Sequence, residues 1–206
     1  MRQNTAHTEN KGPTAEYQSL MQEGELKPDA DQAGTVTELE RLHLELINYA
    51  GAGVKKNRFL VKNGWLSGLF PWSGANQKPP KGIYLYGGVG RGKSMLMDLF
   101  FSVAPLTAKR RVHFHEFMLD IHARLETWHG LFRKKRLQYG EQTSNEDPIP
   151  AIAKQIANET TLLCFDELQV TDIADAMVVA RLFNELFDQG VIVVATSNRA
   201  PDDLYK

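Results

Sequence analysis

The chain has 206 residues, a hydrophobic content of 42% and a formal net charge of −1 at pH 7. These values fit a globular domain with additional segments, and the near-neutral charge gives no overall field that would attract nucleic acid or a membrane surface. Cys164 is the single cysteine, which excludes a disulfide framework and fits a reducing compartment such as the cytoplasm. No apolar run is long enough to span a bilayer, and residues 1–34 are too polar for a secretory signal.

The N-terminal part is predicted to be a tail followed by helices and an irregular stretch. Residues 1–14 are polar and aperiodic, so we expect a disordered tail. The N-terminal segment 15–81 is expected to hold a short helix at 15–24, an amphipathic helix at 36–49 and an irregular stretch at 51–81. Apolar side chains in the irregular stretch are expected to pack on the same domain, with a partner or a membrane surface as alternatives; they are Trp65, Leu66, Leu69, Phe70 and Trp72.

A glycine-rich loop follows an apolar strand candidate at 82–86 and precedes a helix candidate that starts at Met95. Its sequence, GGVGRGKS, has the G-x-x-x-x-G-K-S pattern of a phosphate-binding loop in the required strand–loop–helix context. We expect Lys93 to reach the β- and γ-phosphates of a nucleotide and the Ser94 hydroxyl to ligate Mg²⁺. The predicted nucleotide-binding residues of this loop are Gly87, Gly88, Val89, Gly90, Arg91, Gly92, Lys93, Ser94 and Met95.

Residues 82–206 are predicted to form the core of an α/β fold. Three further apolar strand candidates alternate with helix candidates, the strands at 111–114, 160–165 and 191–195 and the helices at 116–137, 149–157 and 172–189. This alternation is typical of a parallel sheet with helices on both faces, and with the loop it predicts a P-loop NTPase. The helix at 116–137 is expected to bury one stripe, which consists of Phe117, Ile121, Leu125 and Trp128.

An acidic pair follows the apolar residues 162–165. Asp166 then lies at the carboxyl end of a buried strand, where α/β sheets build ligand sites, and is expected to hold Mg²⁺ beside Ser94. Glu167 is expected to orient and activate the attacking water. The alternative is that both acids cap the following helix.

The acidic pair also narrows the class of enzyme. A glutamate directly after the metal-binding acid points away from small-molecule kinases and GTPases, and the chain has no Asn-Lys-x-Asp guanine motif. We therefore expect an ATPase of the additional-strand, catalytic-glutamate class, whose sheet contains a further strand that ends in a polar residue. Asn198, after the strand candidate at 191–195, is the best candidate for the residue that senses the γ-phosphate.

With these segments in view, the chain resembles AAA+ ATPases, and four strings resemble the bacterial cell-division ATPase family ZapE and its mitochondrial relatives, the lactation-elevated ATPases. The strings are GIYLYGGVGRGKSMLMDLFF, VHFHEFMLDIH, LLCFDELQVTDIADAM and VVATSNRAPDDLY. The resemblance implies an ATP-driven factor that acts on FtsZ at the bacterial division site. It also implies an adenine contact before the first strand, for which Asp31 and Gln32 are candidates, and self-association of the complete protein.

The resemblance further implies elements that we expect beyond Lys206. The strand order of such a core is 5-1-4-3-2, and residues 82–206 would supply a core that lacks the fifth strand and the C-terminal helical lid. Such ATPases also offer an arginine to the γ-phosphate bound by a neighbouring subunit. We expect this arginine beyond Lys206 as well. We therefore expect this chain to bind nucleotide and to hydrolyse it slowly or not at all.

The sequence also holds a histidine cluster and two basic runs. His113, His115 and His122 tempt a metal assignment, with the first two on one face of a strand, but no cysteine or paired acid completes a ligand set. The basic runs 109–111 and 133–136 suit a solvated helix end better than a contact with nucleic acid or with an acidic partner tail. The alternative functions are an AAA+ nucleic-acid motor or loader, which the neutral charge disfavours, and a nucleotide-dependent protein-binding module.

Overall fold

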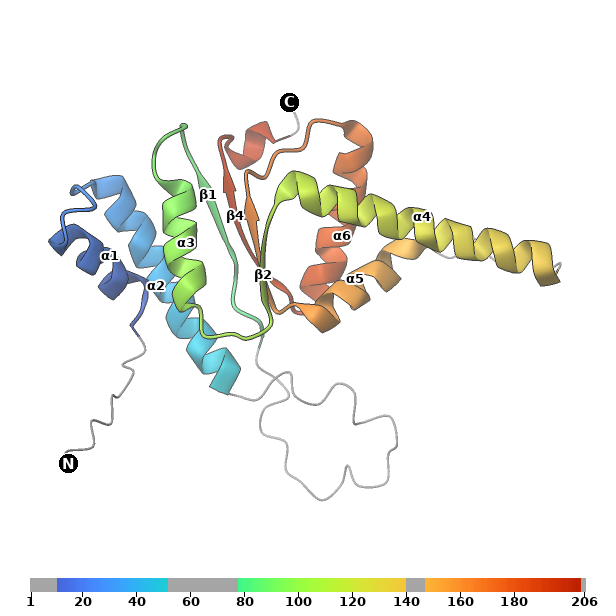
Figure 1. Cartoon of the computed structure of the whole chain (residues 1–206), viewed down its shortest axis with the longest axis horizontal. Coiled ribbons are helices and arrows are strands. Elements are labelled where there is room, and N and C mark those ends of the chain that lie inside the picture. Colours follow the sequence, from blue (N-terminus) through green and yellow to red (C-terminus); the bar gives the residue numbers. More distant parts are fainter. Residues whose placement is uncertain (1–10, 52–77, 140–146, 205–206) are drawn as a thin grey trace, which may run out of the picture. The chain divides into compact units, whose positions relative to one another are not determined.

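A computed structural model describes residues 11–51, 78–139 and 147–204 (Figure 1). The chain divides into two compact units. The first comprises Met1–Lys81 with Ser94–Leu106, and the second comprises Gly82–Lys93 with Thr107–Lys206. The described residues include no helix that is long and apolar enough to cross a membrane.

The first unit is helical. It contains α1 (Pro13–Gln22), α2 (Ala30–Gly51) and α3 (Lys93–Val103) without the first residue of α3. Helix α2 begins six residues before the predicted start at Val36, because the Asp29 carboxylate accepts hydrogen bonds from the backbone N–H groups of Asp31 and Gln32. The buried face of α2 comprises Val36, Leu39, Leu42, His43, Leu46 and Tyr49.

The second unit is built on a four-stranded parallel sheet (Figure 1). The strands are β1 (Ile83–Tyr86), β2 (Lys109–His113), β3 (Leu162–Asp166) and β4 (Ile192–Ser197). Their order is β1-β4-β3-β2, and every neighbouring pair is parallel. This is the predicted order of the four strands. In the described part of the chain, β1 has β4 as its one strand neighbour. All four carboxyl ends meet at one edge of the sheet, which we call the carboxyl edge.

Three helices and a 3₁₀ turn complete the second unit. They are α4 (Phe114–Tyr139), α5 (Pro148–Glu159), α6 (Ile173–Asp188) and η1 (Pro201–Asp203). Helix α6 starts where the Asp172 carboxylate accepts a hydrogen bond from Ala174 N–H at 2.6 Å, and it is followed by Gly190 with φ 77°. The predicted helices of this unit are therefore confirmed to within about two residues at most ends.

The core of the second unit packs one sheet face against all three helices. Leu163, Phe165, Val193 and Ala195 supply the sheet side of this cluster. The Phe165 ring lies 4.8 Å from the Phe117 ring, between centroids. The alternate residues of β3 and β4 face the other way and are buried too; they are Leu162, Cys164, Ile192 and Val194. Burial on both faces confirms the predicted type of sheet.

The predicted stripe of α4 is also confirmed. Phe117 and Ile121 are fully buried, and Leu125 packs partly buried against the same cluster. Trp128 is partly buried.

Strand β1 lies unusually close to β4 at its first residues. A Cβ atom added to Gly82 would lie 1.8 Å from the Val193 carbonyl oxygen, well inside van der Waals contact. The register pairs Ile83 with Val194, so this approach is part of the β1–β4 ladder. A side chain at residue 82 would therefore push β1 out of register.

Several predictions lie outside the described residues. They are the disordered tail over residues 1–10 and the aromatic stretch over residues 52–77. The tail was predicted to reach residue 14, but α1 begins at the buried Pro13, so the prediction is wrong for Pro13 and Thr14. The predicted division of the chain at residues 14 and 81 stays a prediction.

Candidate functional site

The glycine-rich loop connects β1 to α3 in a conformation that requires glycine. Gly90 and Gly92 have φ values of 78° and 80°, in the left-handed region that L side chains rarely adopt. The Gly87 N–H donates a hydrogen bond to the Ser197 carbonyl oxygen at 3.3 Å. The loop therefore begins directly beside the end of β4, at the carboxyl edge.

Lys93 lies at the end of the loop and connects it to Asn198, the residue that directly follows β4. Its ammonium group donates hydrogen bonds to the carbonyl oxygens of Gly87 and Gly88, both at 2.8 Å, and to Asn198 Oδ1 at 2.9 Å. An ammonium group has three N–H donors, so these acceptors use all of them. The structure thus brings together two residues that the sequence assigned to nucleotide chemistry from positions 105 residues apart.

Asp166 is the last residue of β3, as predicted, and its side chain is 8% exposed. Arg111 on β2 donates a hydrogen bond from Nε to Asp166 Oδ2 at 2.7 Å. Asp166 Oδ1 is buried and has no hydrogen-bond partner among the described residues. A buried carboxylate oxygen without a partner is costly, and a hard divalent cation such as Mg²⁺ is the ligand it suits. The donor chemistry at Asp166 therefore fits the predicted metal.

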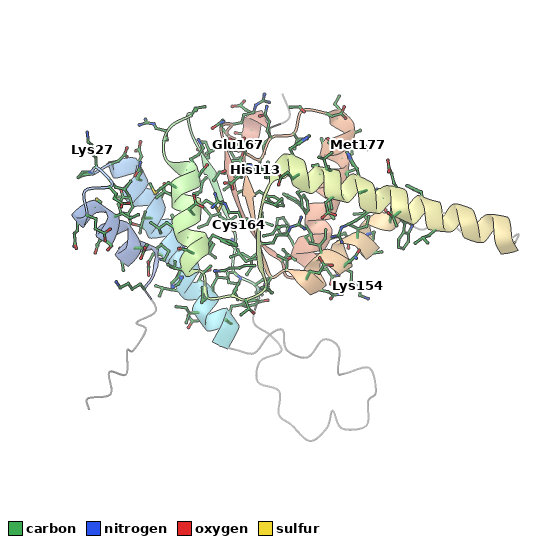
Figure 2. The ribbon with its side chains drawn as sticks, viewed as in Figure 1. Lys27, His113, Lys154, Cys164, Glu167 and Met177 are labelled. Carbon is green, nitrogen blue, oxygen red and sulfur yellow. The ribbon has the colours of Figure 1, made fainter. Side chains whose placement is uncertain are left out.

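Glu167 adopts an unusual backbone conformation for a residue with a side chain. Its φ is 55°, and it is the one non-glycine residue with positive φ in the described chain. Such a conformation costs of order 1 kcal/mol or more and persists where surrounding contacts hold it, often at functional sites. Its side chain is exposed, and Figure 2 shows Glu167 at the same end of the sheet as His113. Helix α6 begins later, with Asp172 as its cap, so the helix-capping alternative for the acidic pair is wrong.

Two residues of this site were not singled out from the sequence. One is Arg111, which lay in a basic run. The other is Thr196, which accepts a hydrogen bond from Glu167 N–H at 3.0 Å through its hydroxyl. Arg111 could have been found from the sequence, because a charged residue inside a strand suggests a partner on the neighbouring strand that ends in Asp166. The role of Thr196 depends on where the chain turns after β3, and no local sequence pattern predicts that turn.

The remaining predicted site residues belong to the first unit. Ser94 is the second residue of α3 and is exposed, and Met95 follows it partly buried. Gln32 lies in the first turn of α2, where its Oε1 accepts a hydrogen bond from the Tyr17 hydroxyl at 3.3 Å. The roles assigned to these residues, and to Asp31, stay predictions.

The structure corrects two expectations, the positions of the histidines and of the basic run 109–111. His115 lies in α4 and not on the strand, because β2 ends at His113, so the expectation that both share one strand face is wrong. His122 pairs with Asp175 at 2.9 Å. The run 109–111 is a strand and not a helix end.

Arg110 also pairs within the unit rather than facing a partner. Its Nη1 contacts Asp120 Oδ2 at 3.2 Å. Asp120 accepts hydrogen bonds from Arg124 as well, and these bonds, ahead of the bond from Arg110, lower the pKa of its carboxyl group.

Cys164 lies on β3 two residues before Asp166, and Figure 2 shows it within the sheet. Burial raises the pKa of its thiol to about 12. It therefore remains a neutral, inert thiol at physiological pH and offers no nucleophile to the site.

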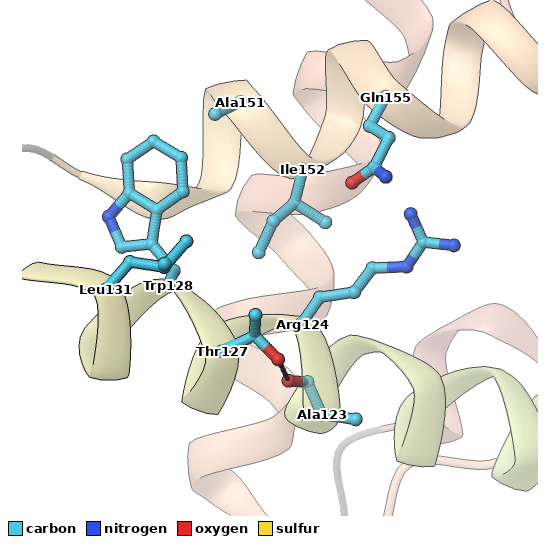
Figure 3. Close-up of a pocket in the computed structure, with 8 residues that line it drawn as sticks. All are labelled: Ala123, Arg124, Thr127, Trp128, Leu131, Ala151, Ile152 and Gln155. Carbon is cyan, nitrogen blue, oxygen red and sulfur yellow. Dashed lines mark hydrogen bonds between the residues drawn. The ribbon is translucent and has the colours of Figure 1, made fainter.

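A separate hollow of about 320 Å³ lies between α4 and α5 (Figure 3). Its walls are mostly apolar, with Trp128, Leu131 and Ile152 among them. The Thr127 hydroxyl donates a hydrogen bond to the Ala123 carbonyl oxygen at 2.8 Å. The lining contains none of the residues predicted for nucleotide chemistry.

The strand order β1-β4-β3-β2, with a glycine-rich loop and lysine after β1 and an acidic pair at the end of β3, defines a P-loop nucleotide-binding fold of the AAA+ type. The chain belongs to the AFG1-like ATPase family, whose model matches residues 11–206.

Named relatives support this membership. The chain is 40% identical over 194 residues to cell division protein ZapE of Escherichia coli K12, which covers 94% of this chain and 48% of the relative. It is 39% identical over 236 residues to lactation elevated protein 1 homolog B of Danio rerio, which covers 98% of this chain and 46% of the relative. The chain thus spans about half the length of these relatives.

Solved structures are similar at lower identity. DnaI aligns with a TM-score of 0.46 and 15% identity, over 88% of this chain and 73% of that chain. Domain III of DnaA from Thermotoga maritima aligns with a TM-score of 0.39 and 21% identity, over 60% of this chain and 46% of that chain.

Proposed function

We propose that this protein binds Mg·ATP at the carboxyl edge and hydrolyses it to ADP and phosphate. The observation that carries this proposal is the 2.9 Å hydrogen bond from Lys93 Nζ to Asn198 Oδ1. It joins the loop expected to hold the phosphates to the residue expected to sense the γ-phosphate. Membership of an ATPase family supports the same reaction.

The proposed reaction assigns a task to each residue. The loop N–H groups and the Lys93 ammonium bind the β- and γ-phosphates. On binding, the ammonium donates to phosphate oxygens in place of its present acceptors, which are the carbonyl oxygens of Gly87 and Gly88 and Asn198 Oδ1. Glu167 orients a water molecule and takes its proton as the water oxygen attacks the γ-phosphorus. The bond from that phosphorus to the bridging oxygen breaks, and ADP leaves. Asn198 contacts the γ-phosphate.

Asp166 and the Ser94 hydroxyl would hold Mg²⁺, and the unpartnered Asp166 Oδ1 is the atom available for it. The bound cation would neutralise negative charge on the phosphate oxygens.

Nucleotide affinity tests the binding half of the proposal. Lys93→Ala removes a charge from the phosphate site, so we expect at least a tenfold loss of affinity for a fluorescent ATP analogue, since a charge-assisted bond contributes about 1.5–3 kcal/mol. Lys154→Ala is the matched control, because Lys154 is exposed on α5. Equal affinity in Lys93→Ala and the control would refute the proposed site.

Turnover tests the chemical half. In the full-length protein, Glu167→Gln keeps the size of the side chain and removes its basicity, so we expect normal nucleotide affinity and hydrolysis slower by about 10²–10⁴ than in the full-length normal protein. Normal hydrolysis by this variant would remove Glu167 from the reaction. Stimulation of hydrolysis by DNA would instead favour a nucleic-acid motor or loader.

We also propose that the complete protein acts on FtsZ polymers at the division site of a bacterial cytoplasm. The support is the 40% identity to a relative named for cell division. Sedimentation of FtsZ polymers with the full-length protein and ATP tests this: we expect the sedimented fraction to change with the normal protein and not with Lys93→Ala. A sedimented fraction that is the same with and without the protein would count against FtsZ as the substrate.

A further inference from the structure

We propose that Thr196 is a positioning residue that holds the Glu167 backbone in the orientation needed for hydrolysis. This proposal rests on the proposed function, because it takes Glu167 to be the residue that activates water. Thr196 itself is 1% exposed and cannot reach a substrate in solution, so its effect must pass through the segment that it contacts.

The contacts of Thr196 surround the turn after β3. Its hydroxyl oxygen accepts from Glu167 N–H at 3.0 Å and lies 3.5 Å from the Phe165 carbonyl oxygen, to which it can donate. Its own carbonyl oxygen accepts from Leu168 N–H at 2.7 Å. One residue of β4 therefore binds the backbone immediately before Asp166 and the two backbone N–H groups after it.

Ser197 fixes the far side of the same turn. Its hydroxyl donates to the Leu168 carbonyl oxygen at 2.7 Å and accepts from Arg199 N–H at 3.1 Å. The chain after β3 is thus attached to β4 through side chains after the regular ladder, which ends with the pair Phe165 and Ala195.

The conformation of Glu167 explains why such attachments are needed. Its φ of 55° is unfavourable for a residue with a Cβ atom, so the backbone would relax toward negative φ without external contacts. Relaxation would rotate the Cα–Cβ bond and redirect the carboxylate. The bonds from Glu167 N–H to the Thr196 hydroxyl and from Leu168 N–H to the Thr196 carbonyl oxygen hold the peptide groups on both sides of Glu167 and so oppose that rotation. Asn198 follows Thr196 by two residues, so the same strand end carries both the contacts of Glu167 and the predicted γ-phosphate sensor.

This arrangement separates positioning from binding. None of the described contacts of Thr196 involves residues 87–93, which are predicted to bind the phosphates. Loss of the hydroxyl should therefore slow hydrolysis and leave nucleotide affinity unchanged.

The test compares Thr196→Val with Thr196→Ser in the full-length protein. Valine keeps the shape and removes the hydroxyl, whereas serine keeps the hydroxyl. Thr161→Val makes the same chemical change at a buried threonine that precedes β3, at the opposite end of that strand from Asp166, and is the matched control. Two quantities are measured: hydrogen exchange of the Glu167 amide without nucleotide, and single-turnover hydrolysis with nucleotide affinity.

For Thr196→Val we expect at least tenfold faster exchange of the Glu167 amide, at least tenfold slower hydrolysis and an ATP affinity within about twofold of normal. Thr196→Ser should restore exchange and hydrolysis, and Thr161→Val should change neither. Unchanged exchange in Thr196→Val, or fast exchange with normal hydrolysis, would overturn the proposal.

Glu167→Gln distinguishes this failure from failure of the proposed function. If Glu167→Gln hydrolyses slowly and Thr196→Val hydrolyses normally, only the positioning role is wrong. If Glu167→Gln hydrolyses normally, the proposed function is wrong in its water-activating residue, and the positioning role is wrong with it.

Discussion

Arg111 Nε and Asp166 Oδ2 lie 2.7 Å apart, on the adjacent strands β2 and β3. The aspartate side chain is 8% exposed and the arginine side chain 20% exposed, so the pair is largely removed from water. Arg111 is thus the described partner that compensates the charge of the predicted metal-binding acid.

Removal of that arginine should destabilise the protein. A largely buried charge left without its partner costs about 3 kcal/mol, so Arg111→Ala should lower the free energy of unfolding in urea by about that amount in the absence of nucleotide. Adding Asp166→Asn should recover much of the loss. Arg110→Ala is the neighbouring control: Arg110 is more exposed and shares Asp120 with Arg124, so we expect a loss below about 1 kcal/mol. Equal losses at both positions would contradict the inferred importance of the Arg111–Asp166 pair.

The pH dependence of stability should carry a contribution from His43. This residue is 1% exposed on α2, and burial lowers the pKa of its imidazole, with a smaller opposing effect from Glu40. The unfolded chain takes up a proton near pH 6.5 while the folded protein does not, so this contribution is complete above about pH 6.5 and is lost as pH falls toward the lowered folded pKa.

A substitution tests that sign. His43→Leu should remove a slope of up to about 1.4 kcal/mol per pH unit from the unfolding free energy between about pH 6.5 and the folded pKa. Urea unfolding at several pH values measures it, with His129→Gln on the exposed side of α4 as the control. A steeper loss of stability in acid for His43→Leu than for the normal protein would show that the sign is wrong.

Cys164 should react with thiol reagents only after unfolding. The thiol is buried and its pKa is raised to about 12, so the folded protein has almost no thiolate at pH 8. We expect no reaction with a disulfide reagent in buffer and one thiol per chain in urea, since the sequence has one cysteine. Rapid reaction in buffer would mean that β3 is open to solvent.

Gly82 should tolerate no side chain. In Gly82→Ala the new Cβ would lie 1.8 Å from the Val193 carbonyl oxygen, so β1 must shift, and we expect a loss of more than about 2 kcal/mol in unfolding free energy. Gly130→Ala in α4 meets no atom within 4 Å and should instead stabilise the protein by about 0.5–1 kcal/mol. The comparison of both variants by urea unfolding separates a steric effect from the general effect of replacing glycine.

The elements that the sequence predicted well are those with strong local signals. Strand β3 is a continuous apolar run that ends in an acid, and the phosphate-loop motif marks the end of β1. Helix α2 begins before its predicted start because the capping role of Asp29 outweighs the polar residues that follow it.

The residues that sequence analysis missed depend on contacts between separate strands. The bond between Thr196 and Glu167 joins residues 29 positions apart, and the bond between Arg111 and Asp166 joins residues 55 positions apart. Both require the register of the sheet and the turn after β3, and the positive φ of Glu167 lies in that same turn. Local periodicity contains none of this information.

The close approach of Gly82 to Val193 also bears on how this family can vary. Strand β1 has four residues, with Gly82 before its first residue and the phosphate loop after its last. A displacement at one end of so short and stiff a segment is transmitted to the other end, where Gly87 meets β4. Natural selection for nucleotide binding should therefore act on residue 82, which has no side-chain chemistry, as strictly as on the residues predicted to contact phosphate.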